Sequence, residues 1–313
     1  MTAPPREAPS TCLVQDPASL TGMVVGIVSA GHMGSGLGWA LRAGGAQVLT
    51  TVDGRSTRTA RLAGEAGLEL RPSLVDVVRE ASTVLVVTPP GAARAAASAI
   101  AEAAAKAGTA PLVADLNAIS PSTVDVIAAI YATAGLDYVD GSISGAPPTV
   151  RAGARLYFSG PRAGEIGGLP WQHVQPIVLS GPIGRASALK MSTASVYKGL
   201  VGLVAQAMRS AAHYGVLDEV LADLRAAGED RVTAVAVAAT KAHRYVPEMH
   251  EISATQAAAG LPGELFQAFA AVYQEIATSR LGAADPESVD KTLSPADVVR
   301  GITPMSGTPP RTP

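Results

Sequence analysis

The sequence predicts an α/β domain with a doubly wound, mostly parallel sheet, followed by an all-α domain. In the first half of the chain, short runs rich in β-branched residues alternate with alanine-rich stretches of helical period. This alternation is typical of parallel strands that are joined by helices. After Gly184 the apolar residues keep helical spacing and no convincing strand follows Leu179. A helical second half is therefore expected.

The predicted elements can be placed in order along the chain. Strands are expected over residues 23–29, 47–52, 83–88, 111–115 and 138–140, with further strand-like runs at 155–159 and 176–179. Helices are expected between the strands, over residues 33–43, 92–107 and 121–134. In the second half, helices are expected over residues 186–224, 230–258 and 263–280. The last of them follows the break Gly260-Leu261-Pro262-Gly263.

The length of the chain and its change in texture predict two domains between two tails. The chain has 313 residues, and a domain commonly contains about 100–200. We expect a flexible leader, a sheet-containing domain, a helical domain and a flexible tail, over residues 1–21, 22–183, 184–300 and 301–313.

The composition argues against several classes of protein. With 48% hydrophobic and 16% charged residues, the chain has enough apolar material for a core, unlike a disordered protein. The net charge of −2 gives no basic bias, so no nucleic-acid partner is expected. Cys12 is the only cysteine, and His243 and His250 belong to no compact ligand set, so no metal site is expected. Because no membrane-length apolar run and no secretory signal are present, no membrane partner and a cytoplasmic location are expected.

A strand, a glycine turn and a helix follow one another between Val24 and Ala43. In the dinucleotide fingerprint G-x-G-x-x-G, the second glycine lets the backbone approach the pyrophosphate and the third lets the helix pack on the strand. Gly31 and Gly34 fill these two positions, and Ser29 stands at the first. The sequence thus predicts a Rossmann domain. Its cofactor-binding turn is expected to consist of Ser29, Ala30, Gly31, His32, Met33 and Gly34.

The end of the second predicted strand favours NADP(H) over NAD(H). Asp53 has the spacing of a carboxylate that binds the ribose 2′-hydroxyl of NAD. Arg55 and Ser56 suit the 2′-phosphate of NADP, because a guanidinium forms planar, charge-assisted hydrogen bonds with phosphate. We expect NADP(H), with Asp53 turned away and with Arg58 either a further phosphate ligand or a solvated charge. The loop after residues 83–88 should line the cofactor cleft through its shape, with Thr88, Pro89 and Pro90.

Four segments, in order and spacing, resemble those of the β-hydroxyacid dehydrogenases, which include 6-phosphogluconate and 3-hydroxyisobutyrate dehydrogenases. They are the G-x-M-G turn at 31–34, two substrate loops at 115–121 and 139–146, and the segment of the catalytic lysine at 184–190. The resemblance covers about residues 23–281. The second half is similar to a less characterised branch with a 6-phosphogluconate-dehydrogenase-like helical domain, and imine reductases are also related. That likeness rests on Leu189-Lys190-Met191, Tyr197-Lys198-Gly199 and residues 243–249.

The resemblance implies hydride transfer with Lys190 as the proton donor and acceptor. It also implies a substrate site that contains Asn117, Ser144, Gly145 and Ala146, and a homodimer that forms through the helical domain. From the residues alone, Lys198 lies about two helical turns after Lys190. Lys198 either binds an anionic group of the substrate or is a solvated lysine.

The chain also departs from the family pattern. Asn117 stands where many members have serine, and Ala146 replaces the second glycine of a Ser-Gly-Gly segment. The asparagine expected one turn after the lysine is Ala194, beside Thr193. The favoured function is hydride transfer between NADP(H) and a small β-hydroxy acid or the corresponding carbonyl compound. The alternatives are an NADPH-dependent imine reductase and a non-catalytic NADP(H)-binding protein.

Overall fold

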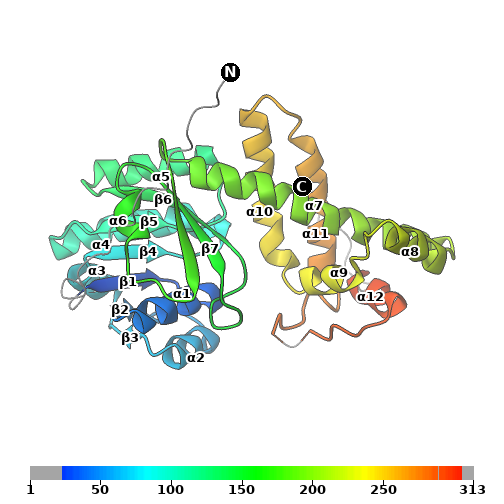
Figure 1. Ribbon diagram of the computed structural model, residues 1–313, viewed down its shortest axis with the longest axis horizontal. Coiled ribbons are helices and arrows are strands. Elements are labelled where there is room, and N and C mark those ends of the chain that lie inside the picture. Colours follow the sequence, from blue (N-terminus) through cyan, green and yellow to red (C-terminus); the bar gives the residue numbers. More distant parts are fainter. Residues whose placement is uncertain (1–22, 288, 305–313) are drawn as a thin grey trace, which may run out of the picture.

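The computed structural model describes residues 23–287 and 289–304. Figure 1 shows a sheet flanked by helices and a group of helices, joined by the long helix α7 (Arg185–His213). This arrangement confirms the fold class that the sequence predicts. The expected leader over residues 1–21 and the part of the expected tail beyond residue 304 lie outside the described residues.

The sheet has eight strands within the described residues, in the order β3-β2-β1-β4-β5-β6-β7-β8. They are β1 (Val24–Val28), β2 (Gln47–Thr50), β3 (Glu69–Leu70), β4 (Thr83–Val86), β5 (Leu112–Asp115), β6 (Tyr138–Ser144), β7 (Ala154–Ser159) and β8 (Val174–Leu179). Strands β1 to β6 run parallel, β7 is antiparallel to β6, and β8 is parallel to β7. The parallel part has the strand order of a Rossmann sheet, in which ligands bind beyond the carboxyl ends of the strands.

Helices cover both faces of the sheet. They are α1 (His32–Ala43), α2 (Thr57–Glu65), α3 (Leu74–Glu80), α4 (Ala93–Ala107), α5 (Pro121–Thr133) and α6 (Ala163–Gly167), with the short 3-10 helix η2 (Pro90–Ala92) before α4. One buried apolar layer joins the sheet to α1, α2 and α6, and a second joins it to α3, α4 and α5. The two layers fix the sheet between its helices, and so hold the ends of its strands in place.

The second part is built around α7. Its other helices are α8 (Leu217–Ala226), α9 (Val232–Ala239), α10 (Ala242–Ala258), α11 (Glu264–Ala277) and α12 (Pro295–Ile302). The hairpin of α10 and α11 crosses α7 (Figure 1), and a third apolar core includes Met191, Met208, Met249 and Tyr273. Among the described residues, none of the helices is both long enough and apolar enough to cross a membrane.

The structure corrects several predicted elements. The expected helix over 186–224 is two helices, because Gly215 takes φ +72° between α7 and α8. The expected helical region over 230–258 is also two helices, α9 and α10. The predicted tail begins too early, since Gly301 and Ile302 are buried residues of α12. Ser294 caps that helix and Pro295 occupies its first turn, which is a start pattern that the sequence analysis missed.

Candidate active site

The glycine turn leads from β1 into α1. Gly31 is the N-cap of α1, no side chain caps the helix, and its first turn has no acidic residue. A Cβ at Gly31 would meet no protein atom within 4 Å, whereas a Cβ at Gly34 would lie 2.2 Å from the carbonyl oxygen of Ser29. Gly34 is therefore required for close packing of helix on strand. The space at Gly31 is open and no side chain caps α1, so its first N–H groups are left for an anion.

Ser29 holds the position of the first fingerprint glycine in a glycine-like conformation. Its φ is +73°, in the left-handed region that costs a non-glycine residue about 1–2 kcal/mol. The turn is therefore kept although the glycine is not. Ala30 is buried and Met33 packs against the apolar core, so these two residues anchor the turn to the core.

Charged residues from both parts of the molecule meet beside this turn. Glu287, between α11 and α12, forms an ion pair with Arg58 and lies 3.6 Å from Arg61. Its carboxylate also lies 4.0 Å from Nδ1 of His32. Burial lowers the pKa of His32, Glu287 opposes this shift, and Arg58 adds to it. The guanidinium of Arg58 thus pairs with Glu287, while 42% of its side chain is exposed.

Asp53, Arg55 and Ser56 lie around the turn that follows β2. Ser56 caps α2, since its Oγ accepts a hydrogen bond from the N–H of Thr59 at 3.3 Å. Asp53 and Arg55 are both exposed and flank Gly54, which takes φ +64°. The residue expected to bind NAD, Asp53, and those expected to bind NADP, Arg55 and Ser56, therefore lie together after the carboxyl end of β2.

Asn117 holds the loop at Thr88 against the end of β5. Its Oδ1 accepts a hydrogen bond from the Thr88 N–H at 2.6 Å. Its Nδ2 donates to Thr88 Oγ1 at 2.9 Å and to Asp115 Oδ2 at 3.1 Å. Both amide hydrogens are therefore used within the protein, and Asn117 acts here as a tie between two strand ends. Pro89 and Pro90 continue from this fixed point into η2.

Lys190 reaches the end of β6. Its Nζ donates a hydrogen bond to the carbonyl oxygen of Ile143 at 2.8 Å, directly before Ser144. Gly145 takes φ +140°, and a Cβ there would lie 2.9 Å from the backbone of β7, so this turn requires glycine. The fold thus brings the predicted lysine together with the predicted loop of Ser144, Gly145 and Ala146.

Asp140, which the sequence analysis did not single out, positions the start of α7. This buried carboxylate accepts hydrogen bonds from the N–H groups of Gly184 and Ser187 at 3.0 and 3.1 Å. It also accepts from the hydroxyls of Ser187 and Ser159 at 2.6 and 2.8 Å. Burial raises the pKa of Asp140 and these hydrogen bonds oppose the shift. Because Lys190 follows Ser187 by less than one turn, Asp140 fixes the base of the lysine.

Lys198 is an enclosed residue. It forms an ion pair with Glu248 of α10, and the exposed fractions of the two side chains are 16% and 8%. Its Nζ lies 4.2 Å from the centroid of the Tyr245 ring. Burial lowers the pKa of Lys198 to about 8, against the effect of Glu248, and the charges of Lys190 and Arg244 lower it further. Lys198 is therefore not the solvated lysine that was one of the two alternatives.

One face of α10 packs on the Rossmann domain. A Cβ at Gly91 of η2 would lie 3.8 Å from Pro247. Glu251 accepts hydrogen bonds from the N–H and Oγ of Ser120, both at 2.7 Å, and from Thr123 Oγ1 at 2.8 Å. Its carboxylate therefore sits at the N-terminus of α5, where negative charge is favourable. Glu248, which pairs with Lys198, lies between these two contacts along α10.

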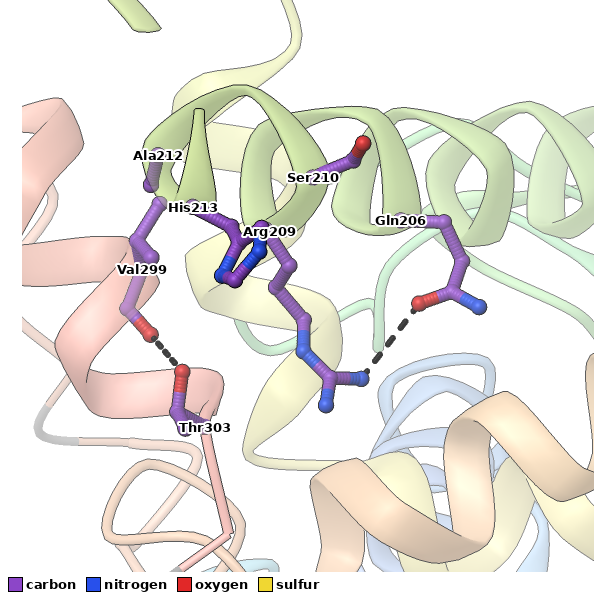
Figure 2. A pocket seen from close by; sticks show the side chains of 7 residues that line it. All are labelled: Gln206, Arg209, Ser210, Ala212, His213, Val299 and Thr303. Carbon is purple, nitrogen blue, oxygen red and sulfur yellow. Dashed lines mark hydrogen bonds between the residues drawn. The ribbon is translucent and has the colours of Figure 1, made fainter. Parts of the chain in front are cut away.

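An open pocket elsewhere on the molecule does not belong to this site. Figure 2 shows it between the last turns of α7 and α12, lined by residues that include Gln206, Arg209 and His213. Arg209 is engaged there by Glu275 at 2.8 Å and by Gln206 at 3.4 Å. The pocket lies about 30 Å along the α7 axis from Lys190. No residue of the predicted site contributes to its lining.

Family models match both parts of the chain. The NAD-binding domain of 6-phosphogluconate dehydrogenase matches residues 24–177. A domain of unknown function, DUF1932, matches residues 211–276. No curated protein gives a significant match to the sequence.

Solved structures share the fold over most of the chain. A conserved protein of unknown function, described as structurally similar to 3-hydroxyacid dehydrogenases, is 25% identical with a TM-score of 0.59, over 82% of this chain and 97% of that one. The 3-hydroxyisobutyrate dehydrogenase of Mycobacterium tuberculosis, solved with L-serine, is 17% identical with a TM-score of 0.62, over 88% and 98%. An imine reductase from Myxococcus stipitatus, solved with NADP+, is 16% identical with a TM-score of 0.50, over 80% and 93%. A V8 variant from the same organism was solved with NAD+.

A dinucleotide-binding Rossmann domain joined to a helical domain by α7 defines the class of protein, which is an NAD(P)-dependent dehydrogenase or reductase. Within that class, residues 24–177 match the NAD-binding domain of 6-phosphogluconate dehydrogenase, and the solved structures that share the fold include 3-hydroxyisobutyrate dehydrogenases and imine reductases. These matches agree with the superfamily that the motifs predict.

Proposed function

We propose that the protein transfers a hydride between NADP(H) and a small β-hydroxy acid or the corresponding carbonyl compound, with Lys190 as the proton donor and acceptor. The observation that carries the proposal is the placement of the Lys190 ammonium 2.8 Å from the Ile143 carbonyl, beside Ser144 and Gly145. This group lies at the carboxyl edge of a sheet whose first strand leads into the cofactor turn.

The residues present fit a bound dinucleotide. The uncapped start of α1 offers backbone N–H groups and the positive end of a helix dipole to the pyrophosphate. The loop at Thr88, fixed by Asn117, would line the cofactor cleft. When bound, the cofactor supplies the hydride.

The protein supplies position and a proton. In the direction of reduction, Lys190 holds a proton at Nζ for the carbonyl oxygen of the substrate. In the direction of oxidation it accepts the hydroxyl proton. The Oγ of Ser144 and the N–H of Gly145 can bind the acid group or the reacting oxygen. Asp140 keeps Lys190 in place through the first turn of α7.

The preference for NADP(H) rests on Arg55, which is exposed beside the cap of α2. We expect wild type to bind NADPH more tightly than NADH, and Arg55→Ala to weaken NADPH binding by about 1.5–3 kcal/mol, the contribution of a hydrogen bond to a charged group. NADH binding should change little. Titration of both cofactors into wild type, Arg55→Ala and the control Asp53→Ala measures this. Equal affinities for both cofactors in wild type would instead favour Asp53 as a ribose ligand and NAD(H) as the cofactor.

Imine reduction is a second candidate because of the residues one turn after Lys190. Thr193 Oγ1 donates its hydrogen bond back to the helix, with the carbonyls of Leu189 and Lys190 each at 3.1 Å, and Ala194 is buried. Neither offers the substrate-orienting amide that the family pattern has there. A screen of carbonyl acids and cyclic imines that follows NADPH absorbance separates the two reactions. Binding of NADPH without turnover of either class would favour the non-catalytic alternative.

The homodimer is proposed on the apolar surface of α7. Val196, Tyr197 and Leu203 are 56%, 66% and 57% exposed, which is unusual for side chains of this size on one helix. Burial of this face against a second copy would remove them from water. Sedimentation at micromolar concentration should give twice the monomer mass, and a monomer would contradict the proposal.

A further inference from the structure

Lys198 and Glu248 form a buried ion pair that leaves one carboxylate oxygen without a hydrogen-bond partner. Only one carboxylate oxygen of Glu248 is engaged, by Lys198. The other, Oε1, is buried and has no hydrogen-bond partner. A buried carboxylate with an unused oxygen costs stability, and such a pair gains little over apolar residues of the same size. This pair is therefore better explained by what it does than by what it stabilises.

The surroundings hold Lys198 in one place. The Tyr245 ring lies beneath its ammonium at 4.2 Å, and Tyr245 packs edge to face on Tyr273 at 5.2 Å between centroids. The hydroxyl of Tyr273 donates a hydrogen bond to the backbone carbonyl of Lys198 at 2.7 Å. A lysine is ordinarily a flexible, strongly hydrated charge. Here α10 and α11 fix both its backbone and its ammonium.

The charges around the pair leave an excess of positive charge. The charged side chains with the largest effect on Lys198 are Glu248 and Arg244 of α10 and Lys190 of α7, and the aromatic neighbours are Tyr245 and Tyr273. In this set of charges, the cations Lys190, Lys198 and Arg244 outnumber the one carboxylate of Glu248, so the set favours an anion. An ammonium has three donors, and Glu248 accepts one of them. With 16% of its side chain exposed, Lys198 keeps donors for a ligand.

We propose that Lys198 binds the acid group of the substrate, with Glu248 and Tyr245 as the residues that position it. Lys190 then acts on the reacting oxygen while Lys198 holds the other end of a small hydroxy acid. This inference rests on the proposed function and deepens it, because it names the residue that binds the acid group of the substrate and the residues that position it. The sequence does not point to Glu248 as the partner of Lys198, because the two residues lie 50 positions apart.

The test compares two probes that differ in one group, 3-hydroxybutanoate and 2-butanol, with NADP+ as the oxidant. Wild type should prefer the acid. Lys198→Met should raise KM for 3-hydroxybutanoate about 10- to 100-fold, the range for one charge-assisted hydrogen bond, with a smaller change in kcat. Lys198→Arg should restore part of the preference. Arg209→Met, which removes a cation at the far end of α7, is the matched control and should behave as wild type.

Glu248→Gln separates positioning from folding. A stabilising pair predicts a lower melting temperature in this variant. If the pair positions Lys198, Glu248→Gln should raise KM for the acid. Its melting temperature should be unchanged or higher, because the buried charge of Glu248 is gone. NADPH affinity should stay the same in all variants, which shows that they are folded.

The proposal fails if Lys198→Met keeps the wild-type preference for the acid. If neither probe is turned over, calorimetric titration of each into the NADPH complex measures the same preference as binding. Equal binding of the two probes, or no binding of either, would overturn the role of Lys198. The requirement for Lys190 in hydride transfer is measured separately, on whichever substrate the screen provides, so the two claims fail independently.

Discussion

Lys190→Ala is expected to lower turnover by about 10²–10⁴-fold, the range for loss of a positioned acid or base. The Nζ of Lys190 lies at the end of β6, 2.8 Å from the Ile143 carbonyl, while the cofactor turn lies after β1. NADPH affinity should therefore change little. The loss should appear in kcat more than in KM, because the proton is transferred in the transition state.

A matched control is Lys106→Ala, which removes an exposed lysine at the end of α4. Its kinetic constants and NADPH affinity should equal those of wild type. Steady-state kinetics of both variants on the best substrate of the screen, with cofactor titrations beside them, give the comparison. Turnover of Lys190→Ala near the wild-type value would make Lys190 a bystander and would favour imine reduction or a mechanism without lysine.

Asp115→Asn is expected to stabilise the protein at pH 8 and to flatten the pH dependence of its stability. Asp115 lies at the end of β5 and is almost completely buried. Burial raises its pKa from 3.8 to about 7, and the hydrogen bonds from Asn117 oppose the shift. The folded protein therefore binds a proton more strongly than the unfolded chain does. Between about pH 4 and pH 7 the free energy of unfolding should fall as the pH rises.

The size of the effect follows from the shift. One pKa unit corresponds to about 1.4 kcal/mol, so ionisation of Asp115 costs as much as about 4 kcal/mol above pH 7. Asparagine cannot ionise, but its Nδ2 would face Nδ2 of Asn117 and lose one hydrogen bond, worth about 1 kcal/mol. The net gain at pH 8 should be about 2–3 kcal/mol.

Urea unfolding of wild type and Asp115→Asn between pH 4 and pH 8 measures this difference. The control is Asp125→Asn, which removes an exposed carboxylate from α5 and should keep the wild-type pH profile. A wild-type stability that rises steadily across this range, unchanged by Asp115→Asn, would contradict the assigned ionisation.

Most of the fold could be predicted because the spacing of apolar residues and the glycine turns are set within single helices and strands. Apolar period and glycine turns located β1, α1 and the parallel strands β2, β4, β5 and β6. The strand β3 has two residues, too few for an alternation of apolar and polar side chains to be recognised, and both side chains are exposed. The break after α7 depends on one glycine in the left-handed region, whereas the glycines at 199 and 202 lie inside the helix. Composition alone does not separate these cases.

Sequence reasoning could mark residues of the candidate site only where one segment carries its own geometry. Gly34 is required by contact with Ser29 five residues away, and Lys190 is marked by its own segment. Asp140, Glu248 and Glu251 were missed because their partners lie 47, 50 and 131 residues away. A buried carboxylate leaves no periodic trace in a sequence. Only the tertiary fold shows which N–H group or ammonium it binds.

The central claim is hydride transfer at this site, and it can be measured directly. NADPH that carries deuterium at the transferable position of its nicotinamide is incubated with the protein and with the carbonyl acids and cyclic imines of the screen, and the products are analysed by mass spectrometry. We expect one deuterium on the former carbonyl carbon of a reduced acid, with transfer lost in Lys190→Ala. Tight binding of NADPH with no deuterium in any product, or transfer to imines alone that Lys190→Ala leaves intact, would contradict it.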